Sequence, residues 1–335
     1  MLTISIVCPI YNESNYISFC IESIINQDYP LDKIEVLFVD GMSTDTTREI
    51  VNDFSMKYSF IKLIDNPLRI VSQALNIGIK ASSGEIIVRM DAHCIYPNNY
   101  LSLLVYYLIE LKADNVGGMI LTLPANSTNI ANAISTVMSH PFGVGNSLFR
   151  IGCKKIKKVD TVPFGCFHRG IFDRIGFFDP DLIRNQDDEF CARIIKSGGK
   201  IYLIPDIIIK YFARDNIKKL WLMFYQYGLY KPLVTKKIGF PSTARQFFPL
   251  LFVLGIIGGI GISSFNDPAF LVTALILILY FLLSITVSSF EALSQKKTYL
   301  LFILPFLFIV LHVSYGWGYL MGIVKFFLLN KTKKV

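Results

Sequence analysis

The stretch TISIVCPIYNE, residues 3–13, gives the first indication of the fold class of the chain. Its first six residues favour a strand, and Pro9 ends the run just before the polar cluster at 11–13. The spacing of apolar residues over 17–25 then predicts a helix, and a second apolar strand follows at 34–39. A strand, a helix and a second strand in this order are typical of a parallel sheet covered by helices.

The same alternation continues along the chain. Further strands are expected at 60–64, 85–90, 115–123 and 200–204, and further helices from about Thr44 and at 72–81, 98–112 and 187–197. The strands are nearly continuous apolar runs, as expected when helices cover both faces of a sheet. The sequence therefore predicts an α/β fold with a mixed, mainly parallel sheet.

Composition separates a soluble-looking body from an apolar tail. Of the 335 residues, 53% are hydrophobic and 17% charged, which excludes a disordered chain, and the mean hydropathy of +0.48 is high for a wholly soluble protein. Residues 246–335 hold only two acidic and six basic side chains. The net charge of +8 is modest and interleaved, so it gives no indication of nucleic-acid binding.

The tail contains three apolar stretches. Residues 247–265 and 269–290 carry no charge, and each is long enough to cross a hydrocarbon core of roughly 30 Å as a helix. The third stretch, 298–330, is long for one crossing and short for two, and His312, Gly316, Gly318 and Gly322 interrupt it. We expect it to be re-entrant or interfacial, with its glycines serving helix packing.

Basic residues set the expected orientation. Residues 210–245 contain eight basic side chains and one acid, and the loop at 295–297 and the terminal residues 331–334 are also basic. Such segments prefer the cytoplasmic side, which puts the turn at 263–267 outside. The start of the chain does not resemble a signal peptide, and the six cysteines form no CxxC pair, so we expect reduced thiols and a cytoplasmic body on the inner or plasma membrane.

Three strands end in polar clusters, which parallel strands would bring to one edge. These clusters are residues 9–13, 40–45 and 91–93, and each alone is equally compatible with a turn or a helix cap. Asp91 and His93 together suit a divalent metal, Mg²⁺ or Mn²⁺, that would neutralise a diphosphate, and Tyr11 could stack on a base. Neither a Walker motif nor a GxGxxG after a strand is present, which argues against a P-loop ATPase and a dinucleotide dehydrogenase.

A second acidic group lies at residues 185–190. Its carboxylates fit a helix N-terminus, where they complement the helix dipole. They also fit a general base that deprotonates an acceptor hydroxyl. Asp187 is the better candidate for the base, because Glu189 is spaced to pair with Arg193 one turn later.

Taken in order, these segments resemble the family 2 glycosyltransferases of the GT-A fold, and most closely the membrane-anchored, succinoglycan-type exopolysaccharide branch. The resemblance covers about residues 3–232. It is carried by IVCPIYNE (6–13), VDGMSTD (39–45), ALNIGI (74–79), GEIIVRMDAH (84–93), FG (164–165), HR (168–169), IGFFD (175–179) and QDDEF (186–190).

The resemblance implies inverting sugar transfer from a nucleotide-diphosphate sugar, with UDP as the expected nucleotide, to a hydroxyl of a lipid-linked or growing polysaccharide acceptor. It implies a catalytic domain at 1–232, a basic connector at 233–246 and a membrane domain at 247–330. The resemblance also assigns roles to residues. Asp187 would be the catalytic base, and Asp91 and His93 would bind metal and diphosphate. The base and ribose would be bound by Pro9, Tyr11, Glu13 and Asp40, and the acceptor or diphosphate side would be formed by His168, Arg169, Asp188 and Gln226.

The chain departs from the family pattern at three places. His93 replaces the second carboxylate of the DxD site, Gln186 replaces the acid before the base, and residues 226–231 stand where a QxxRW motif is expected. The missing motif favours addition of a single sugar over processive synthesis. Two alternatives stay open: a polyprenyl-phosphate sugar transferase, and a catalytically silent, membrane-anchored module that binds nucleotide-sugar. A transporter would carry polar groups inside its spans, and only His312 lies there.

Overall fold

The structure is a computed structural model that describes residues 1–241, 243–263 and 267–330. The chain forms two compact units. The first comprises Met1–Leu121 and Gly152–Tyr211, and the second comprises Thr122–Ile151 and the described residues from Phe212 to Asn330.

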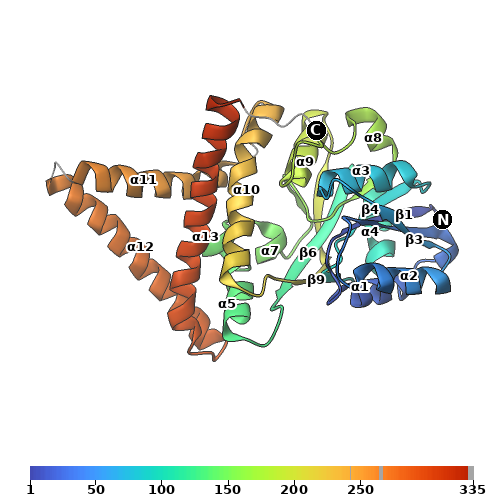
Figure 1. The fold of residues 1–335 in the computed structure, drawn as a ribbon, viewed down its shortest axis with the longest axis horizontal. Helices are drawn as coiled ribbons and strands as arrows, with labels where there is room; N and C mark the ends of the chain where they lie inside the picture. The colour runs from blue at the N-terminus through green and yellow to red at the C-terminus, as the bar shows by residue number, and fades with distance from the viewer. Residues whose placement is uncertain (242, 264–266, 331–335) are drawn as a thin grey trace. The chain divides into compact units, whose positions relative to one another are not determined.

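The first unit is built on one sheet, which Figure 1 shows with helices on both of its faces. Along the sheet the strand order is β3-β2-β1-β4-β8-β6-β9-β5, with β7 paired to β9. Strands β1 to β4 run parallel to one another, and β8 is antiparallel to β4. The described strands are β1 (Ile4–Ile10), β2 (Ile34–Asp40), β3 (Ile61–Asp65), β4 (Ile86–Arg89), β5 (Cys94–Ile95), β6 (Asn115–Leu123), β7 (Lys157–Lys158), β8 (Cys166–His168) and β9 (Ile201–Phe212).

Successive residues of β1 point to opposite faces, and each meets a different helix. Val7 faces Gly78, where an added methyl group would lie 2.4 Å from the valine. Cys8 is fully buried on the other face against Cys20. The helices of this unit are α1 (Ile17–Ile25), η1 (Leu31–Lys33), α2 (Thr47–Lys57), α3 (Val71–Ala81), α4 (Tyr100–Glu110), α8 (Gly170–Ile175) and α9 (Gln186–Lys196).

The second unit is helical apart from the ends of β6 and β9 that reach into it. Three of its apolar segments are long enough to cross a membrane, Ala244–Ile262, Pro268–Ser294 and Leu300–Leu328. Its described elements are α5 (Asn129–Val137), α6 (Pro141–Val144), α7 (Leu148–Ile151), α10 (Ile217–Ile238), η2 (Ala244–Gln246), α11 (Phe247–Ser263), α12 (Asp267–Ser294), α13 (Leu300–Ile323) and the π-helical turn η3 (Val324–Leu328).

Glycines bring α10 and α13 into backbone contact. A methyl group on Gly228 would lie 2.0 Å from the carbonyl oxygen of Tyr315, and one on Gly318 would lie 2.2 Å from that of Tyr225. The prediction that the tail glycines serve helix packing is therefore confirmed. The whole of α10 belongs to the second unit with α13, and the domain boundary at 232 stays a prediction.

Most predicted elements are found within a few residues of their expected bounds. Strand β9 is longer than expected and continues to Phe212, and the helix expected from Thr44 begins at Thr47. The third apolar stretch is an unbroken helix over Leu300–Ile323 rather than an interrupted one. All six cysteines are free thiols. The centre of the predicted turn at 263–267 and the terminal residues 331–334 lie outside the described residues.

The substitution Gly228→Ala is expected to lower the unfolding temperature of the full chain in detergent. The added methyl group cannot fit against the Tyr315 carbonyl, and overpacking of this kind costs about 1–3 kcal/mol. Gly255→Ala is the matched control, because a methyl group on Gly255 in α11 meets nothing within 4 Å. Equal melting temperatures for the two variants would contradict the role of Gly228.

Candidate active site

The loops that follow β1 and β2 are joined by bonds between side chains and backbone. The amide of Asn12 donates to Ser43 Oγ at 2.9 Å, and the amide of Thr44 donates to Asn12 Oδ1 at 2.9 Å. Asn12 has a φ of 52°, a left-handed conformation that asparagine tolerates well. One asparagine therefore holds both loops in a fixed relation at the carboxyl edge of the sheet.

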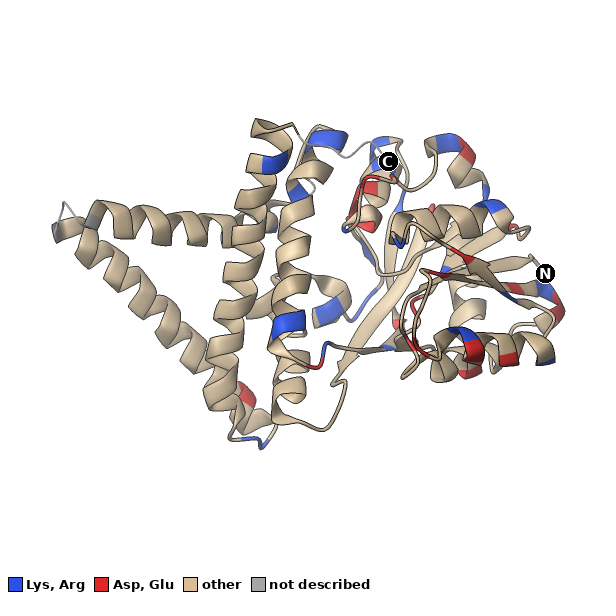
Figure 2. Cartoon of the chain, in the orientation of Figure 1, with Lys and Arg blue, Asp and Glu red and all other residues tan. Residues whose placement is uncertain are grey.

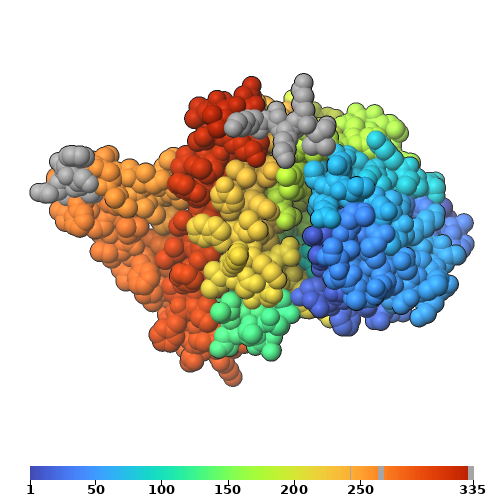
Figure 3. Space-filling view, viewed as in Figure 1, coloured from blue at the N-terminus to red at the C-terminus, as the bar shows by residue number. Residues whose placement is uncertain are grey.

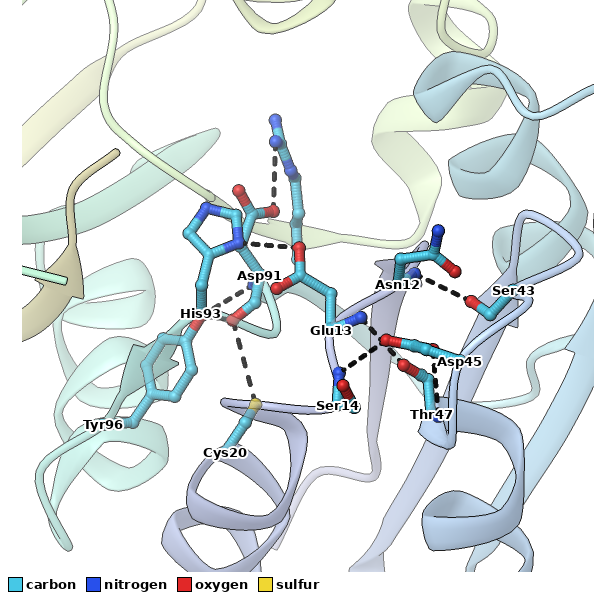
Figure 4. Close-up of polar contacts among 11 residues, drawn as sticks. Asn12, Glu13, Ser14, Cys20, Ser43, Asp45, Thr47, Asp91, His93 and Tyr96 are labelled. Atoms are coloured by element: carbon cyan, nitrogen blue, oxygen red, sulfur yellow. Dashed lines mark hydrogen bonds and ion pairs between the residues drawn. The ribbon is translucent and has the colours of Figure 1, made fainter. Parts of the chain in front are cut away.

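Asp45 and Thr47 add a second set of bonds between these loops (Figure 4). The amide of Glu13 donates to Thr47 Oγ1 at 2.8 Å, and the amide of Ser14 donates to Asp45 Oδ2 at 3.2 Å. Burial acts to raise the pKa of Asp45, but the hydrogen bonds from Thr47 and Ser14 outweigh it, so the pKa is lowered. The carboxylate stays ionised and holds the loop that carries Glu13.

Asp40 lies fully buried at the end of β2. Its carboxylate accepts hydrogen bonds from the amide and the hydroxyl of Ser43 and from Arg48, which also pairs with Asp65 at 2.8 Å. Asp40 thus stabilises the loop that follows β2. The sequence analysis had left open that the cluster at 40–45 forms a turn, and these bonds agree with that alternative. A contact between Asp40 and a base or ribose stays a prediction.

Tyr11 is the exposed aromatic of the β1 loop. Tyr11 is 46% exposed, and the guanidinium carbon of Arg69 lies 5.7 Å from the centroid of the Tyr11 ring. Pro9 sits inside β1, opposite Val39 of β2, and makes no part of the exposed loop. Of these two residues, Tyr11 is therefore the one whose side chain is open to stacking by a planar base at this edge.

Asp91 begins a rigid turn between β4 and β5. Its amide donates to the hydroxyl of Tyr96 at 2.7 Å, and that hydroxyl donates back to the Asp91 carbonyl at 3.2 Å. Because Tyr96 is only 2% exposed, its ring fixes the turn from inside the core. The Asp91 side chain remains 20% exposed at the edge of the sheet.

His93 and Glu13 form a pair across this edge. Figure 4 shows their side chains pointing toward each other, with His93 Nδ1 3.0 Å from Glu13 Oε1. The imidazole also packs edge-on against Tyr211, with ring centroids 5.1 Å apart. A carboxylate on one ring nitrogen orients the other nitrogen, Nε2, toward a ligand. Glu13, assigned by resemblance to the base and ribose, therefore stands beside the residue expected to bind metal.

Arg89, which the sequence analysis did not single out, connects the two acidic groups. Its side chain is 9% exposed, and Nη2 lies 3.2 Å from Asp91 Oδ1 while Nη1 lies 3.7 Å from Asp187 Oδ2. Burial acts to lower the pKa of Arg89, but Asp91 and Asp187 outweigh it and the pKa is raised, so the cation persists. Within the described residues, Nε and Nη1 have no hydrogen-bond partner.

Asp187 lies in the first turn of α9, where its carboxylate also accepts a bond from the amide of Asp188 at 3.0 Å. Burial and the neighbouring Asp188 raise the pKa of Asp187, while Arg89 acts in the opposite direction. The side chain keeps 39% of its surface exposed, so it can still be reached from solvent. Glu189 pairs with Arg193 at 2.7 and 2.8 Å, which confirms the expected helical pair.

The structure places His168 and Arg169 away from this edge. Strand β8 is antiparallel to β4, so His168 lies opposite Ile86 at the amino end of β4, whereas Asp91 follows the carboxyl end. Arg169 donates to the carbonyls of Gly84 and Ile79 and to Ser82, which are contacts within the fold. The antiparallel direction of β8 therefore separates these two residues from Asp91, and their assignment to acceptor or diphosphate stays a prediction.

Of the other two candidates on that side, Asp188 lies beside Asp187 in α9, and Gln226 lies in α10 of the second unit. The site end of β8 is instead marked by Phe164 and Gly165, both with positive φ. The carbonyl of Gly165 accepts the Arg89 amide at 3.0 Å, and the Phe164 ring lies 5.9 Å from the guanidinium. A charged residue that ends a buried apolar strand was the signal that could have identified Arg89.

The donor set fits a cation that arrives with a diphosphate. Within the described residues, no three His, Cys, Asp or Glu side chains gather into a metal-binding group. Asp91 and His93 provide one oxygen and one nitrogen ligand, and Mg²⁺ or Mn²⁺ commonly completes such a partial shell with substrate phosphates and water. The residues present therefore suit a shared metal rather than a permanently bound one.

Comparison with known proteins agrees with this geometry. The family model described as glycosyl transferase family 2 matches residues 5–176. This chain belongs to glycosyl transferase family 2. A dolichyl N-acetyl-alpha-D-glucosaminyl phosphate 3-beta-D-2,3-diacetamido-2,3-dideoxy-beta-D-glucuronosyltransferase of Methanococcus voltae is 30% identical to this glycosyltransferase over 96% of the chain and 97% of its own length. The succinoglycan biosynthesis protein ExoA of Rhizobium meliloti is 28% identical, over 67% of each chain.

Solved structures support the fold of this glycosyltransferase. The mannosyltransferase PcManGT of Pyrobaculum calidifontis, solved with GDP-Man and Mn²⁺, superposes with a TM-score of 0.61 at 18% identity, over 94% of this chain and 87% of its own. TarS 1-349 of S. aureus, solved with UDP-GlcNAc, gives 0.51 at 14% identity, over 95% and 90%. The GT-A fold predicted by resemblance is confirmed.

Arg89→Met is expected to lower the turnover number by about 10²-fold or more, because Asp91 and Asp187 then lack the cation between them. Arg89→Lys restores the charge without the planar fork and is expected to recover part of that loss. The measurement is the steady-state rate of sugar transfer in detergent, with kcat and KM determined separately.

The control is Arg174→Met, which removes a half-exposed arginine paired with Asp114 away from this edge. Turnover by Arg89→Met equal to that of Arg174→Met would show that the buried guanidinium contributes nothing to the reaction.

Proposed function

We propose that this glycosyltransferase moves a single sugar, with inversion at the anomeric carbon, from a nucleotide-diphosphate sugar to a hydroxyl of a lipid-linked saccharide. The observation that carries the proposal is the buried Arg89 guanidinium between Asp91 and Asp187. One carboxylate stands at the end of a parallel strand, where donors bind in open sheets, and the other stands at the first turn of a helix. Two acidic groups with different tasks thus share one cation.

The reaction is a single displacement. Asp187 accepts the proton of the acceptor hydroxyl, whose oxygen attacks the anomeric carbon as the bond from that carbon to the donor's diphosphate oxygen breaks. The products are the glycosylated acceptor and the nucleoside diphosphate. Arg89 keeps Asp187 oriented and balances its charge, so that the carboxylate needs no rearrangement before it takes the proton.

Donor binding falls to the loops at the carboxyl edge. The exposed ring of Tyr11 offers a stacking face for the base. Asp91 and His93 would hold Mn²⁺ or Mg²⁺ together with the diphosphate, and a bound cation stabilises the charge that develops on the leaving group. Structural neighbours bound to UDP-GlcNAc and to GDP-Man with Mn²⁺ support a nucleotide-sugar donor, and we propose UDP as the nucleotide.

The acceptor is a polyprenyl-type lipid that already carries a sugar. The Methanococcus voltae relative, which matches nearly the whole chain, is named for transfer to a dolichyl-linked N-acetylglucosamine phosphate. Three helices long enough to cross a membrane are consistent with such an acceptor. We place the catalytic unit on the cytoplasmic face, because the basic segment 210–245 and the loop at Lys296 and Lys297 favour that side.

Asp187→Asn is expected to reduce the transfer rate by about 10²–10⁴-fold while the donor still binds, because only the proton acceptor is lost. Asp91→Asn is expected to weaken donor binding instead, since the diphosphate loses its metal partner. The measurements are calorimetric donor binding and transfer rate for each variant. Asp173→Asn, an exposed carboxylate on α8, is the matched control. Full activity in Asp187→Asn would remove this residue from the mechanism.

Removal of divalent metal by EDTA is expected to abolish transfer, and added Mn²⁺ or Mg²⁺ is expected to restore it. The assay uses the purified full chain, a panel of nucleotide-sugars, and polyprenyl lipids with and without a first sugar. Transfer onto a bare polyprenyl phosphate would favour the phosphate-sugar transferase. Donor binding without transfer to any acceptor would favour the silent module. If the chain showed no donor binding and no transfer, the proposal that it is an enzyme would be overturned.

A further inference from the structure

We propose that α13 does not cross the bilayer but lies along its surface, with one apolar face in the lipid, and that α11 and α12 form the crossing hairpin. This gives α13 a defined partner, the interfacial layer of the membrane. The proposal concerns the second unit alone and does not depend on what the first unit transfers.

The first argument is that α13 and α10 run side by side and cannot be separated by the membrane surface. A methyl group on Gly318 would meet the Tyr225 carbonyl at 2.2 Å, and one on Gly322 would meet the Leu229 carbonyl at 2.3 Å. Further along, Lys236 Nζ donates to the Phe326 carbonyl at 2.7 Å. Figure 3 shows the yellow surface of α10 lying along the red surface of α13. Wherever α13 lies in the bilayer, α10 must lie beside it.

The second argument is the charge on α10. Its sequence contains Lys218, Lys219, Lys231, Lys236 and Lys237, and Lys218 and Lys219 are exposed. The contacts between the two helices join residues about 90 positions apart. Extended along the two helices, that spacing pairs Lys219 with the turn of α13 around Ile309, which lies inside the apolar segment Leu300–Leu328. If α13 crossed the membrane, it would carry these lysines into the hydrocarbon, where charges are costly.

The third argument is the pattern of exposure along α13. In α13, Phe302, Phe306 and Trp317 are exposed and Val313 is partly exposed, and Phe327 is exposed in η3 directly after it. Their spacing places them on one face of the helix. The buried residues of α13 pack against helices of the same unit, namely α10, α11, α12, α5 and α6. A helix that is apolar on its single open face and covered on the others has the form of an in-plane membrane helix.

The α11–α12 hairpin differs from α13 on each of these points. Only 17% and 6% of the residues in its two spans are buried, compared with half of those in α13. Figure 1 shows α11 running crosswise to α13, and Figure 2 shows α11 and most of α12 without charged residues. Spans of 19 and 27 residues are long enough for the hydrocarbon core, so a hairpin inserted across the bilayer leaves α13 along its surface.

The charges near the two ends of α13 fit the same arrangement. Lys296 and Lys297 precede it, with Lys297 Nζ 3.1 Å from Asn132 Oδ1 of α5, and Lys325 follows it. A crossing helix would leave one of these basic ends on the outer side. A surface helix leaves both on the cytoplasmic side, where anionic headgroups attract lysine.

The first test measures the depth of tryptophan in vesicles. The chain contains only Trp221 and Trp317, so Trp221→Phe leaves Trp317 as the single probe. Two further variants lack both native tryptophans and carry Phe302→Trp or Phe327→Trp. Each is reconstituted into phosphatidylcholine vesicles with bromine at shallow, middle or deep positions of the acyl chain. We expect the same quenching profile for all three probes, with the strongest quenching by shallow bromine. Strong quenching of Trp317 alone by deep bromine would show that α13 crosses, because the helix centre would then lie in the middle of the bilayer.

The second test determines the side of each end. Single cysteines at Pro268, Lys296 and Leu329 are introduced into Cys153→Ser, since the other five native cysteines are buried. An impermeant maleimide is applied to intact cells and to inverted vesicles. We expect Lys296→Cys and Leu329→Cys to react from the same side and Pro268→Cys from the other. Reaction of Lys296→Cys and Leu329→Cys from opposite sides, or of all three from one side, would overturn the proposal. Neither test measures donor binding or sugar transfer. Both tests would therefore still report the position of α13 if the proposed function were wrong.

Discussion

The buried guanidinium of Arg89 is the interaction on which the arrangement of the site depends. Asp91 belongs to a turn after β4 and Asp187 to the first turn of α9, and their carboxylates would repel each other without a cation between them. Burial acts to lower the pKa of Arg89, but Asp91 and Asp187 outweigh it, so the two acids keep the buried guanidinium charged. Phe164 covers the guanidinium and limits the access of water to it. The separation of Asp91 and Asp187 is thereby set by a side chain in the core of the protein.

Around this ion cluster, the loops are held by short polar side chains rather than by packing. Asn12 and Ser43 join the β1 and β2 loops, and Tyr96 fixes the Asp91 turn from inside the core. Glu13 then orients His93 from a neighbouring loop. The Asn12, Ser43 and Glu13–His93 bonds link segments that are distant in sequence, and the Asp91–Tyr96 bonds close a local turn, so loops at this edge of the sheet are held in place. Such preorganisation is what the proposed binding of a flexible diphosphate would require.

In the second unit a different constraint governs, which is the close approach of two backbones. Glycines at 228, 318 and 322 let α10 and α13 touch along their length, and side chains at these positions would push them apart. The contact couples a very apolar helix to one that carries five lysines. Hydropathy alone treats the three apolar helices as equivalent, whereas this packing distinguishes α13 from the hairpin of α11 and α12.

The sequence by itself determined the α/β fold, the order of its elements, the apolar tail and the position of Asp91, His93 and Asp187, because these follow from local periodicity and from motifs read in order. It also identified the Glu189 and Arg193 pair, which depends only on helical spacing. Only the tertiary structure decided what depends on residues far apart in the chain. The antiparallel direction of β8 placed His168 and Arg169 at the amino end of β4, and burial between two distant acids gave Arg89 its place. The assignment of α10 to the second unit likewise rests on contacts about 90 residues apart, which no local pattern can reveal.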